Sequence, residues 1–333
     1  MALRWGILAT GTIAKAFARH LPTSATGELV AVASRTADRA KAFADDIGGD
    51  VTAHGTYDAL LEDPTVDAVY ISTPHPMHAA WAIRAAEAGK RVLCEKPLTM
   101  NARETETVID AARAHDVFLM EAFMYRCHPQ TQRLVELLQA GVVGEVRDIE
   151  AVHSFKGSSD PAGRLLAPAL GGGGILDVGC YCVSGARLVA AVVLGDDAVE
   201  PLDVEGSCDL AHTGVDRRAD ATLTFEGGIR ARLSCGVAKR RAPLLRITGT
   251  AGTISVPAPW LPTLDGNMTT TIHVDHERVE VTAERGLYAY QADVVDAGVA
   301  TFPAPTTDDT LATMRTLDRW RQAVGVRYEV DPW

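Results

Sequence analysis

The sequence predicts an α/β protein with a doubly wound parallel sheet in its first domain and a mainly antiparallel sheet in its second. Strand patterns alternate with helix patterns up to about residue 121, which is typical of parallel sheets with right-handed crossovers. After residue 145 the strand-like runs mostly alternate apolar with polar residues and are joined by short turns. With 333 residues, 47% of them hydrophobic, the chain is long enough for two cores. We expect domains at 1–121 and 122–333.

The first element is an apolar strand, Arg4–Ala9, followed by a turn and by helical spacing over Ile13–Leu21. A pyrophosphate can bind at such a helix start if small residues let the backbone approach. In the slots of G-x-G-x-x-G the chain has Ala9, Gly11 and Ala14, so only the central glycine is present. A glycine turn without a ligand therefore remains an alternative at this point.

The following segments repeat the strand and helix alternation, which favours a dinucleotide-binding sheet. They are strands over 28–34, 66–72, 91–97 and 117–121, with helices over 38–47, 77–88 and about 101–115. Where NAD enzymes carry an acidic residue after the second strand, this chain has Ser34 and Arg35, with Arg39 one turn later. Hydroxyl and guanidinium groups bind a 2′-phosphate, so we expect NADP, with NAD possible. A solvated arginine is the alternative.

The run Arg91–Pro97 is a short buried strand that places Lys96 at its carboxyl end and is stopped by Pro97. Ligands of open α/β sheets bind outside the carboxyl ends of the strands, so Lys96 is a catalytic candidate. The alternative is a lysine that extends to solvent. The loop Thr73–Pro76 and His78 follow another strand end and are candidates for lining the nicotinamide, although histidines at helix starts are often surface residues.

In the second half, four successive glycines, 171–174, precede Asp177, Tyr181 and an apolar helix that runs to Leu194. The glycines permit either close approach to a bound molecule or a flexible loop. If the helix has begun by Asp177, then Asp177 and Tyr181 share one helix face and are a candidate acid/base pair. The alternative is a helix-capping aspartate and a core tyrosine.

Later strand-like runs are connected by short turns. A helix over 306–324 ends the pattern, and we expect it to pack back on the first domain. We predict hairpin connections at Asp216–Arg217 and Glu226–Gly228. Burial of an uncovered sheet face against a second copy predicts a homodimer or higher homo-oligomer. The predicted strands are 146–155, 204–212, 219–225, 229–237, 244–248 and 270–274.

Composition limits the partners. A formal net charge of −11 argues against nucleic acid and acidic membrane surfaces. The apolar run Leu188–Leu194 is too short to span a bilayer. Six cysteines without paired spacing predict cytosolic thiols and thus a cytoplasmic protein, and no cysteine or histidine spacing predicts a metal site.

Five segments together resemble the Gfo/Idh/MocA oxidoreductases: Trp5–Ala14, Ala33–Arg35, Ser72–Pro74, Ala88–Pro97 and Gly172–Tyr181. Tyr181, where many members carry histidine, and the segment Met120–Arg126 are similar to the branch with dimeric dihydrodiol dehydrogenase, D-xylose dehydrogenase, glucose–fructose oxidoreductase and sugar ketoreductases. The resemblance implies a Rossmann domain followed by an α/β domain on an open antiparallel sheet that is often used for dimerisation.

The resemblance also implies hydride transfer between a nicotinamide and a carbinol or carbonyl carbon of a sugar, polyol or related diol. Lys96 and Tyr181 would act together, with Asp177 orienting them. A non-catalytic NADP-binding regulator and an NAD-recycling glycosidase are alternatives on the same fold. The candidate substrate residues are Arg126, His128, Phe155 and Arg164, and the candidate cofactor residues are Ala9, Gly11, Thr12, Ile13, Ser34, Arg35, Arg39, Thr73, Pro74, His75, His78, Glu95 and Lys96.

Overall fold

The computed structural model describes residues 2–333, which form two compact units. Unit 1 contains the chain up to Thr99 together with Glu104–Cys127 and Glu284–Thr307. Unit 2 contains Met100–Arg103, His128–Ala283 and Asp308–Trp333. The chain therefore passes between the units several times, and a functional domain boundary at 121/122 stays a prediction.

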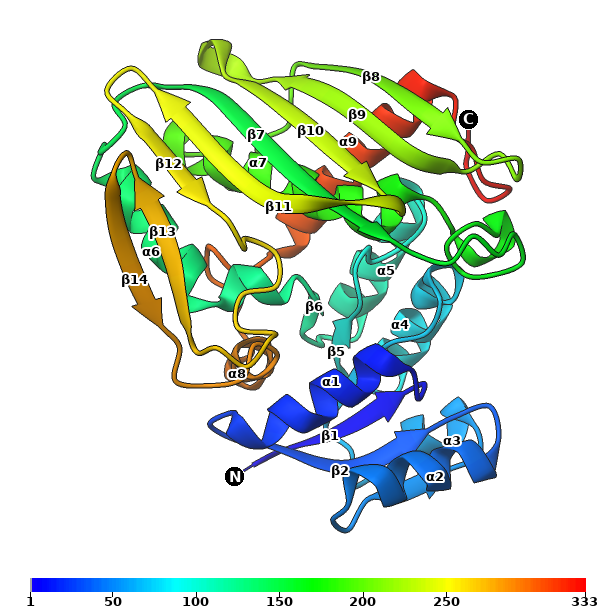
Figure 1. The fold of residues 1–333 in the computed structure, drawn as a ribbon. Coiled ribbons are helices and arrows are strands. Elements are labelled where there is room, and N and C mark those ends of the chain that lie inside the picture. Colours follow the sequence, from blue (N-terminus) through cyan, green and yellow to red (C-terminus); the bar gives the residue numbers. More distant parts are fainter. Residues whose placement is uncertain (1) are drawn as a thin grey trace. The chain divides into compact units, whose positions relative to one another are not determined.

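Unit 1 is built on a parallel sheet of six strands in the order β3-β2-β1-β4-β5-β6 (Figure 1). This confirms the doubly wound sheet that strand and helix alternation predicted. The strand order reverses between β1 and β4, and ligands of such sheets bind at the carboxyl ends on either side of the reversal. The strands are β1 Leu3–Leu8, β2 Gly27–Ala33, β3 Thr52–His54, β4 Ala68–Ile71, β5 Arg91–Cys94 and β6 Leu119–Glu121.

Most helices of unit 1 follow the predicted spacing, but helix α8 and two short elements were not predicted. β3 has three residues, none of them buried, and α3 has five, so neither leaves a clear apolar period. Such lengths lie below what periodicity resolves. The helices are α1 Thr12–His20, α2 Ala37–Ile47, α3 Tyr57–Leu61, α4 His78–Glu87, α5 Ala102–Ala114 and α8 Ala289–Ala297, with α5 beginning in the segment of unit 2.

The segment Glu284–Thr307 joins unit 1 through polar contacts that are remote in sequence. On α8, Asp293 accepts a hydrogen bond from the Ala25 backbone at 2.7 Å and Asp296 accepts one from the Thr26 hydroxyl at 2.7 Å. The Arg91 guanidinium donates to the Val295 carbonyl at 2.9 Å. No local pattern predicts contacts between residues more than 200 positions apart. The sequence analysis therefore assigned this segment to the second domain.

Unit 2 contains a sheet of eight strands in the order β14-β13-β12-β11-β7-β10-β9-β8. Every pairing is antiparallel except that of β7 with β10, so the sheet is mixed but mainly antiparallel, as predicted. The strands are β7 Val146–Lys156, β8 Asp203–Leu210, β9 Asp216–Thr224, β10 Arg230–Gly236, β11 Ala238–Gly249, β12 Thr253–Val256, β13 Thr269–Val274 and β14 Glu277–Thr282.

One of the two predicted hairpin connections in this sheet is wrong. Asp216–Arg217 are the first residues of β9, and the turn lies at 211–215, where the Ala211 amide bonds the Val215 carbonyl at 2.8 Å. Asp216 was predicted in a turn because aspartate is common there, but it is fully buried and its carboxylate binds the Ile175 amide inside the protein. The connection at Glu226–Gly228 between β9 and β10 is confirmed.

Helix α7 (Cys180–Leu194) packs on β7 and β10, with α6 (Pro129–Gln139) beside it (Figure 1). The stretch Pro168–Leu194 has the length and apolar composition of a membrane span, but 94% of its most apolar window is buried inside the protein. A core helix accounts for this composition.

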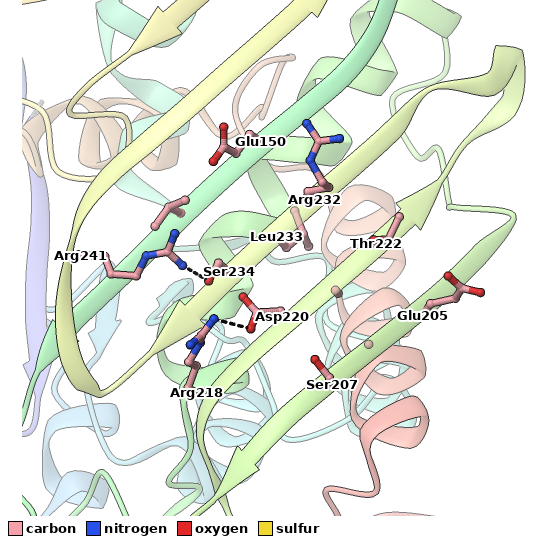
Figure 2. A pocket seen from close by; sticks show the side chains of 13 residues that line it. Glu150, Glu205, Ser207, Arg218, Asp220, Thr222, Arg232, Leu233, Ser234 and Arg241 are labelled. Carbon is pink, nitrogen blue, oxygen red and sulfur yellow. Dashed lines mark hydrogen bonds and ion pairs between the residues drawn. The ribbon is translucent and has the colours of Figure 1, made fainter.

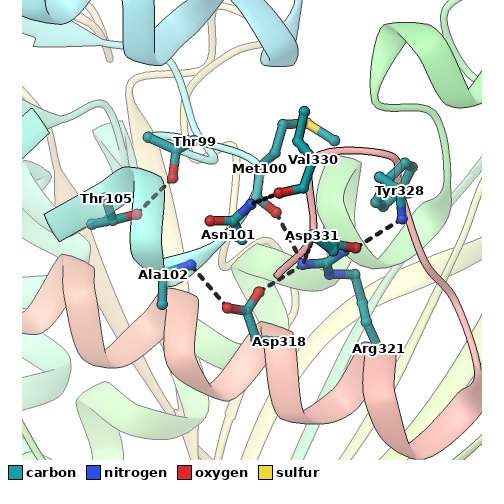
Figure 3. Close-up of polar contacts among 10 residues, drawn as sticks. All are labelled: Thr99, Met100, Asn101, Ala102, Thr105, Asp318, Arg321, Tyr328, Val330 and Asp331. Carbon is teal, nitrogen blue, oxygen red and sulfur yellow. Dashed lines mark hydrogen bonds and ion pairs between the residues drawn. The ribbon is translucent and has the colours of Figure 1, made fainter. Parts of the chain in front are cut away.

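Helix α9 (Thr307–Val324) groups, from Asp308 onward, with unit 2, where its buried Arg321 binds the carboxyl-terminal segment (Figure 3). Arg321 contacts Asp318 and Asp331 at 2.6 Å each and donates to the Met100 carbonyl at 3.0 Å. Asp331 in turn accepts from the Tyr328 amide at 2.8 Å. A buried cation with paired carboxylates thus fixes the chain end and the segment at Met100. Packing of this helix on the first domain stays a prediction.

Candidate active site

The start of α1 has an open backbone suited to an anion. Its N-cap, Gly11, makes no side-chain capping bond, the first turn holds no acidic residue, and a Cβ added at Gly11 would meet nothing within 4 Å. The first amides of a helix carry partial positive charge and bind phosphate well. Ala9, in the first glycine slot, has φ +81°, a left-handed conformation that favours glycine. Ala9 therefore has a backbone angle that a glycine in the first slot of the fingerprint would adopt more easily.

The residues after β2 form a polar and basic edge next to this helix start. Ser34 is buried, and its hydroxyl lies 3.1 Å from the Thr10 hydroxyl, which links the two loops. Arg35 and Arg39 are exposed, and neither makes an ion pair within residues 2–333. The Arg35 charge lies close enough to Tyr57 to oppose the rise in the Tyr57 pKa that burial causes. Two guanidinium groups with no carboxylate partner suit a phosphate.

The loop after β4 carries an unsatisfied hydroxyl. Thr73 is 6% exposed, and its Oγ1 has no hydrogen-bond partner within the described chain. Buried polar atoms nearly always have partners, so an orphaned hydroxyl at a strand end is consistent with a ligand site. The open cap at Gly11, the Arg35 and Arg39 edge and this hydroxyl are all features that fit a dinucleotide.

His78 and His75 are both buried, with ring centroids 5.7 Å apart. His78 bridges two loops: Nδ1 lies 2.9 Å from the Pro97 carbonyl and Nε2 lies 2.8 Å from the Thr73 carbonyl. Burial lowers the pKa of His78 to about 4, so the ring is neutral and donates to one of the two carbonyls. His78 therefore braces the loop after Lys96, and its direct contact with the nicotinamide stays a prediction.

Lys96 follows β5, as predicted, and the Lys96–Pro97 peptide is cis. The preceding residue, Glu95, is buried and accepts a hydrogen bond from the Tyr70 hydroxyl at 2.5 Å. Its second oxygen lies 3.3 Å from the Lys96 amide nitrogen. With Glu95 held on one side and the Pro97 carbonyl held by His78 on the other, the backbone that carries Lys96 is fixed at both ends.

In unit 2, Asp177 lies in a π-helical turn, Ile175–Gly179, that continues into α7 and Tyr181. The Asp177 carboxylate binds Arg164 at 2.9 and 3.4 Å. The Tyr181 ring packs edge-on against His153 with centroids 5.1 Å apart and lies 6.1 Å from Trp260. The helix has begun before Asp177, which was the condition for placing the two candidates on one face.

The glycine run is explained by contacts within unit 2. A Cβ on Gly173, whose φ is +120°, would come within 2.6 Å of Asp216 Oδ1, and one on Gly174 would come within 3.0 Å of Gly236 Cα. The Tyr328 hydroxyl donates to the Gly172 carbonyl. The sequence left two alternatives, a flexible loop and close approach to a bound molecule. The structure shows close approach of the protein's own groups, and contact of the glycines with a bound molecule stays a prediction.

The candidate substrate residues have separate surroundings. Arg126 is buried in unit 1 and donates to the Pro303 carbonyl at 2.6 Å. In unit 2, His128 is fully buried and caps α6 through the Gln130 amide at 3.1 Å, and Phe155 packs beside an apolar cluster. Burial lowers the pKa of His128 to about 4. Arg164 alone is exposed, with its head group on Asp177. Roles for these four residues in substrate binding stay predictions.

The structure places all the candidate cofactor residues in unit 1, and in unit 2 it pairs Asp177 with Arg164 while the Tyr181 ring packs on His153 and Trp260. The meeting of Lys96 with Tyr181 stays a prediction. Sequence reasoning missed several residues that support the candidates, because each is one polar or aromatic residue inside a strand or loop pattern and has no motif of its own. They are Thr10, Tyr57, Tyr70, His153, Asp216 and Trp260.

A Rossmann sheet with an open helix cap at its switch point, followed by a mixed, mainly antiparallel sheet, is typical of nicotinamide-dependent oxidoreductases of two domains. Residues 3–123 match the model of an oxidoreductase family with an NAD-binding Rossmann fold, and residues 131–255 match the Gfo/Idh/MocA carboxyl-terminal domain. The chain belongs to the Gfo/Idh/MocA family, and it is an NAD(P)-dependent oxidoreductase of that family.

Named relatives match along nearly the whole chain. Trans-1,2-dihydrobenzene-1,2-diol dehydrogenase from Danio rerio is 36% identical over 343 aligned positions, covering 99% of each chain. D-xylose 1-dehydrogenase (NADP(+)) 2 from Haloferax volcanii is 35% identical over 322 positions, covering 95% of each. The solved structure of KijD10, a 3-ketoreductase from Actinomadura kijaniata, in complex with NADP and TDP-benzene, has a TM-score of 0.82 at 28% identity and covers 97% of this chain and 98% of its own.

Ala9 leads to a testable prediction. Replacing it by glycine removes left-handed strain of about 1–2 kcal/mol, offset by about 0.4–1 kcal/mol of extra unfolded-state entropy. Ala9→Gly should therefore unfold at higher urea concentration than the wild type and bind NADP at least as tightly. The matched control, Ala16→Gly inside α1, should lose about 0.5–1 kcal/mol of stability. Loss of stability in both variants would contradict the strain assigned to Ala9.

Proposed function

We propose that this protein is an NADP-dependent dehydrogenase or ketoreductase acting on a carbinol or carbonyl carbon of a sugar, polyol or related diol. The observation that carries the proposal is a lysine on a rigid loop at the carboxyl end of β5, in the same unit as a dinucleotide cradle. Relatives of nearly full length act, by their names, on a sugar and on a cyclic diol. A third, the ketoreductase, was solved with NADP and a nucleotide-linked ligand.

The residues proposed to hold the cofactor are those of the cradle described above. The helix start at Gly11 receives the pyrophosphate, Ser34 and Arg35 receive the 2′-phosphate, and Thr73 supplies a hydroxyl near the nicotinamide. When bound, the nicotinamide provides the hydride chemistry. The protein contributes binding, orientation and movement of one proton.

Tyr181 is proposed to move that proton. In oxidation its phenolate oxygen takes the hydroxyl proton as the carbinol carbon loses hydride, and in reduction the phenol returns it. A phenol has an ordinary pKa of about 10, which is too high for an efficient base near neutral pH. The Lys96 ammonium lowers it by stabilising the phenolate and also hydrogen-bonds the substrate oxygen. Solved variants of the KijD10 ketoreductase include substitutions of one lysine and one tyrosine, which are the same two residue types.

Lys96→Ala and Tyr181→Phe should each lower kcat by about 10²–10⁴, the usual contribution of a positioned proton donor. NADP affinity, measured by cofactor fluorescence, should stay within a few-fold because the cradle is intact. Lys41→Ala is the matched control, since Lys41 is 73% exposed on α2 and pairs only with Asp45 at 3.1 Å. Near-normal turnover of either site variant with NADP and a sugar would contradict the assignment. A panel of aldoses, keto-sugars, inositols and dihydrodiols identifies the substrate class.

The preference for NADP over NAD is proposed from Arg35 and Ser34. Arg35→Ala should raise the KM for NADP about 10–100-fold, because a charge-assisted hydrogen bond contributes about 1.5–3 kcal/mol, and should leave the KM for NAD nearly unchanged. Arg19→Ala, which removes an exposed guanidinium from α1, is the control. A wild-type enzyme that prefers NAD would overturn this preference.

The NAD-recycling glycosidase alternative differs in its cofactor balance. A glycosidase of that kind regenerates its cofactor within each turnover, so absorbance at 340 nm stays constant while sugar is cleaved. The proposed dehydrogenase changes absorbance in proportion to product. The same assay therefore separates the two functions.

We also propose that two copies pair through the open face of the unit 2 sheet, in the cytoplasm, where the six free cysteines stay reduced. This face carries a hollow of about 490 Å³ that is lined by residues of strands β7, β8, β9, β10 and β11 (Figure 2). Its charges alternate, with Arg218 paired to Asp220 at 3.0 Å and Arg232 paired to Asp148 at 2.8 Å. Such a surface suits a polar, self-complementary interface.

Sedimentation velocity tests this interface. The wild type should sediment as a dimer or a multiple of it, and Arg232→Glu, which sets like charges side by side, should shift it to monomer. Arg133→Glu on α6, outside the hollow, is the control. A monomeric wild type would contradict the proposal.

A further inference from the structure

Asp216 is a buried carboxylate with no role in the mechanism described so far. It is the first residue of β9 and has no exposed surface. Its Oδ2 accepts a hydrogen bond from the Ile175 amide at 2.8 Å, while Oδ1 has no partner within the described chain. Burying a carboxyl group with one unpartnered oxygen lowers the stability of the fold, so we expect Asp216 to make a contact that offsets this cost.

The amide that Asp216 holds is at the start of the helix that carries Asp177 and Tyr181. The first residues of a helix have amides without intrahelical partners, and the helix dipole favours a negative charge there. Gly174 precedes Ile175 as the N-cap and has no side chain to supply a capping bond. Asp216 therefore caps this helix from a neighbouring strand.

The capped turn is a π turn, Ile175–Gly179, and the helix continues as a regular α-helix from Cys180. A π turn holds one more residue than an α turn, so its register sets the directions of the side chains within it and after it. If the turn relaxed to α geometry, Asp177 would rotate relative to Tyr181 by about one residue's step, roughly 100°. The Asp216 contact and the glycine backbone that packs on it oppose this relaxation.

We propose that Asp216 is a positioning residue that holds the π turn in register and thereby aims Asp177 and Tyr181 for the reaction. This inference rests on the proposed function, in which Tyr181 moves the proton. Asp216 itself touches neither substrate nor cofactor in this scheme, and it acts through the amide of Ile175.

Several groups surround the Asp216 carboxyl. Hydrogen bonds from the backbone amides of Ile175, Asp216 and Gly174, and then the charge of Arg321 on α9, act to lower the pKa of Asp216. The Asp216 charge in turn helps to raise the pKa values of Tyr328 at the chain end, Cys235 of β10 and Cys208 of β8. Burial dominates and raises the pKa of Asp216 to about 7. An aspartate ionises near pH 4 when unfolded, so this group stabilises the fold at low pH, and that contribution is lost as pH rises through neutrality.

The test compares Asp216→Ala, Asp216→Asn and Tyr181→Phe, with Asp209→Asn as the control for an exposed carboxylate on β8. Asp216→Ala should lower kcat about 10–100-fold, leave the NADP dissociation constant within about twofold, and speed deuterium exchange in the peptide 172–182. Asp216→Asn retains an acceptor oxygen and should recover most of kcat and of the protection. Asp209→Asn should match the wild type.

The double variant Asp216→Ala/Tyr181→Phe separates positioning from general stability. If Asp216 acts through Tyr181, the double variant should be no slower than Tyr181→Phe alone, because coupled residues are not additive. An equal loss in both backgrounds would overturn the proposal, as would wild-type kcat and wild-type exchange in Asp216→Ala.

Two further measurements keep the test decisive. If Asp216→Ala does not fold, Asp216→Asn still tests the buried carboxyl. Its melting temperature should rise relative to that of the wild type between pH 5 and pH 8. A constant difference between the two would contradict the raised pKa of Asp216. If the wild type turns over none of the sugar and diol panel, the proposed function fails. Unchanged deuterium exchange in Asp216→Ala would separately contradict the role of Asp216 in holding the π turn.

Discussion

The unmet hydrogen-bonding capacity at a helix start is the constraint on which both halves of this protein depend. At α1 the cap is Gly11, with no side-chain capping bond and open space where a side chain would lie. At the turn before α7 the cap is Gly174, and the protein's own Asp216 binds the next amide at 2.8 Å. The same physical requirement thus leaves an anion site in unit 1 and fixes a pair of side chains in unit 2.

The loop that presents Lys96 follows a related principle. Its backbone is flanked by Glu95, bonded to Tyr70 at 2.5 Å, and by the Pro97 carbonyl, 2.9 Å from His78. Glu95 and His78 are both buried. The backbone of Lys96 is therefore held by groups that take no part in the reaction, while its long side chain keeps its rotatable bonds. Functional side chains need such support, because a misplaced catalytic group loses much of its effect.

The sequence predicted the Rossmann sheet and the position of Lys96 because alternation and strand ends are local patterns. It did not predict the association of Glu284–Thr307 with unit 1, which depends on contacts such as that of Asp293 with Ala25. It also placed Asp216 in a turn, since an aspartate between polar neighbours looks like turn chemistry until its buried partner is known. The glycine run was ambiguous for the same reason, because only coordinates identify the atoms that a side chain would strike.

Three departures from ordinary folding rules lie close to the residues proposed for function. Ala9 is left-handed where glycine fits better, the Thr73 hydroxyl is buried without a partner, and Asp216 is a buried acid with one unsatisfied oxygen. Stable proteins seldom keep such costs in places where packing alone decides. Other unpartnered buried atoms and left-handed residues lie elsewhere in residues 2–333. The first two of these three lie in the loops proposed to hold the cofactor and the third caps the helix of Tyr181, so at these positions the strain and the motif residues point to the same parts of the chain.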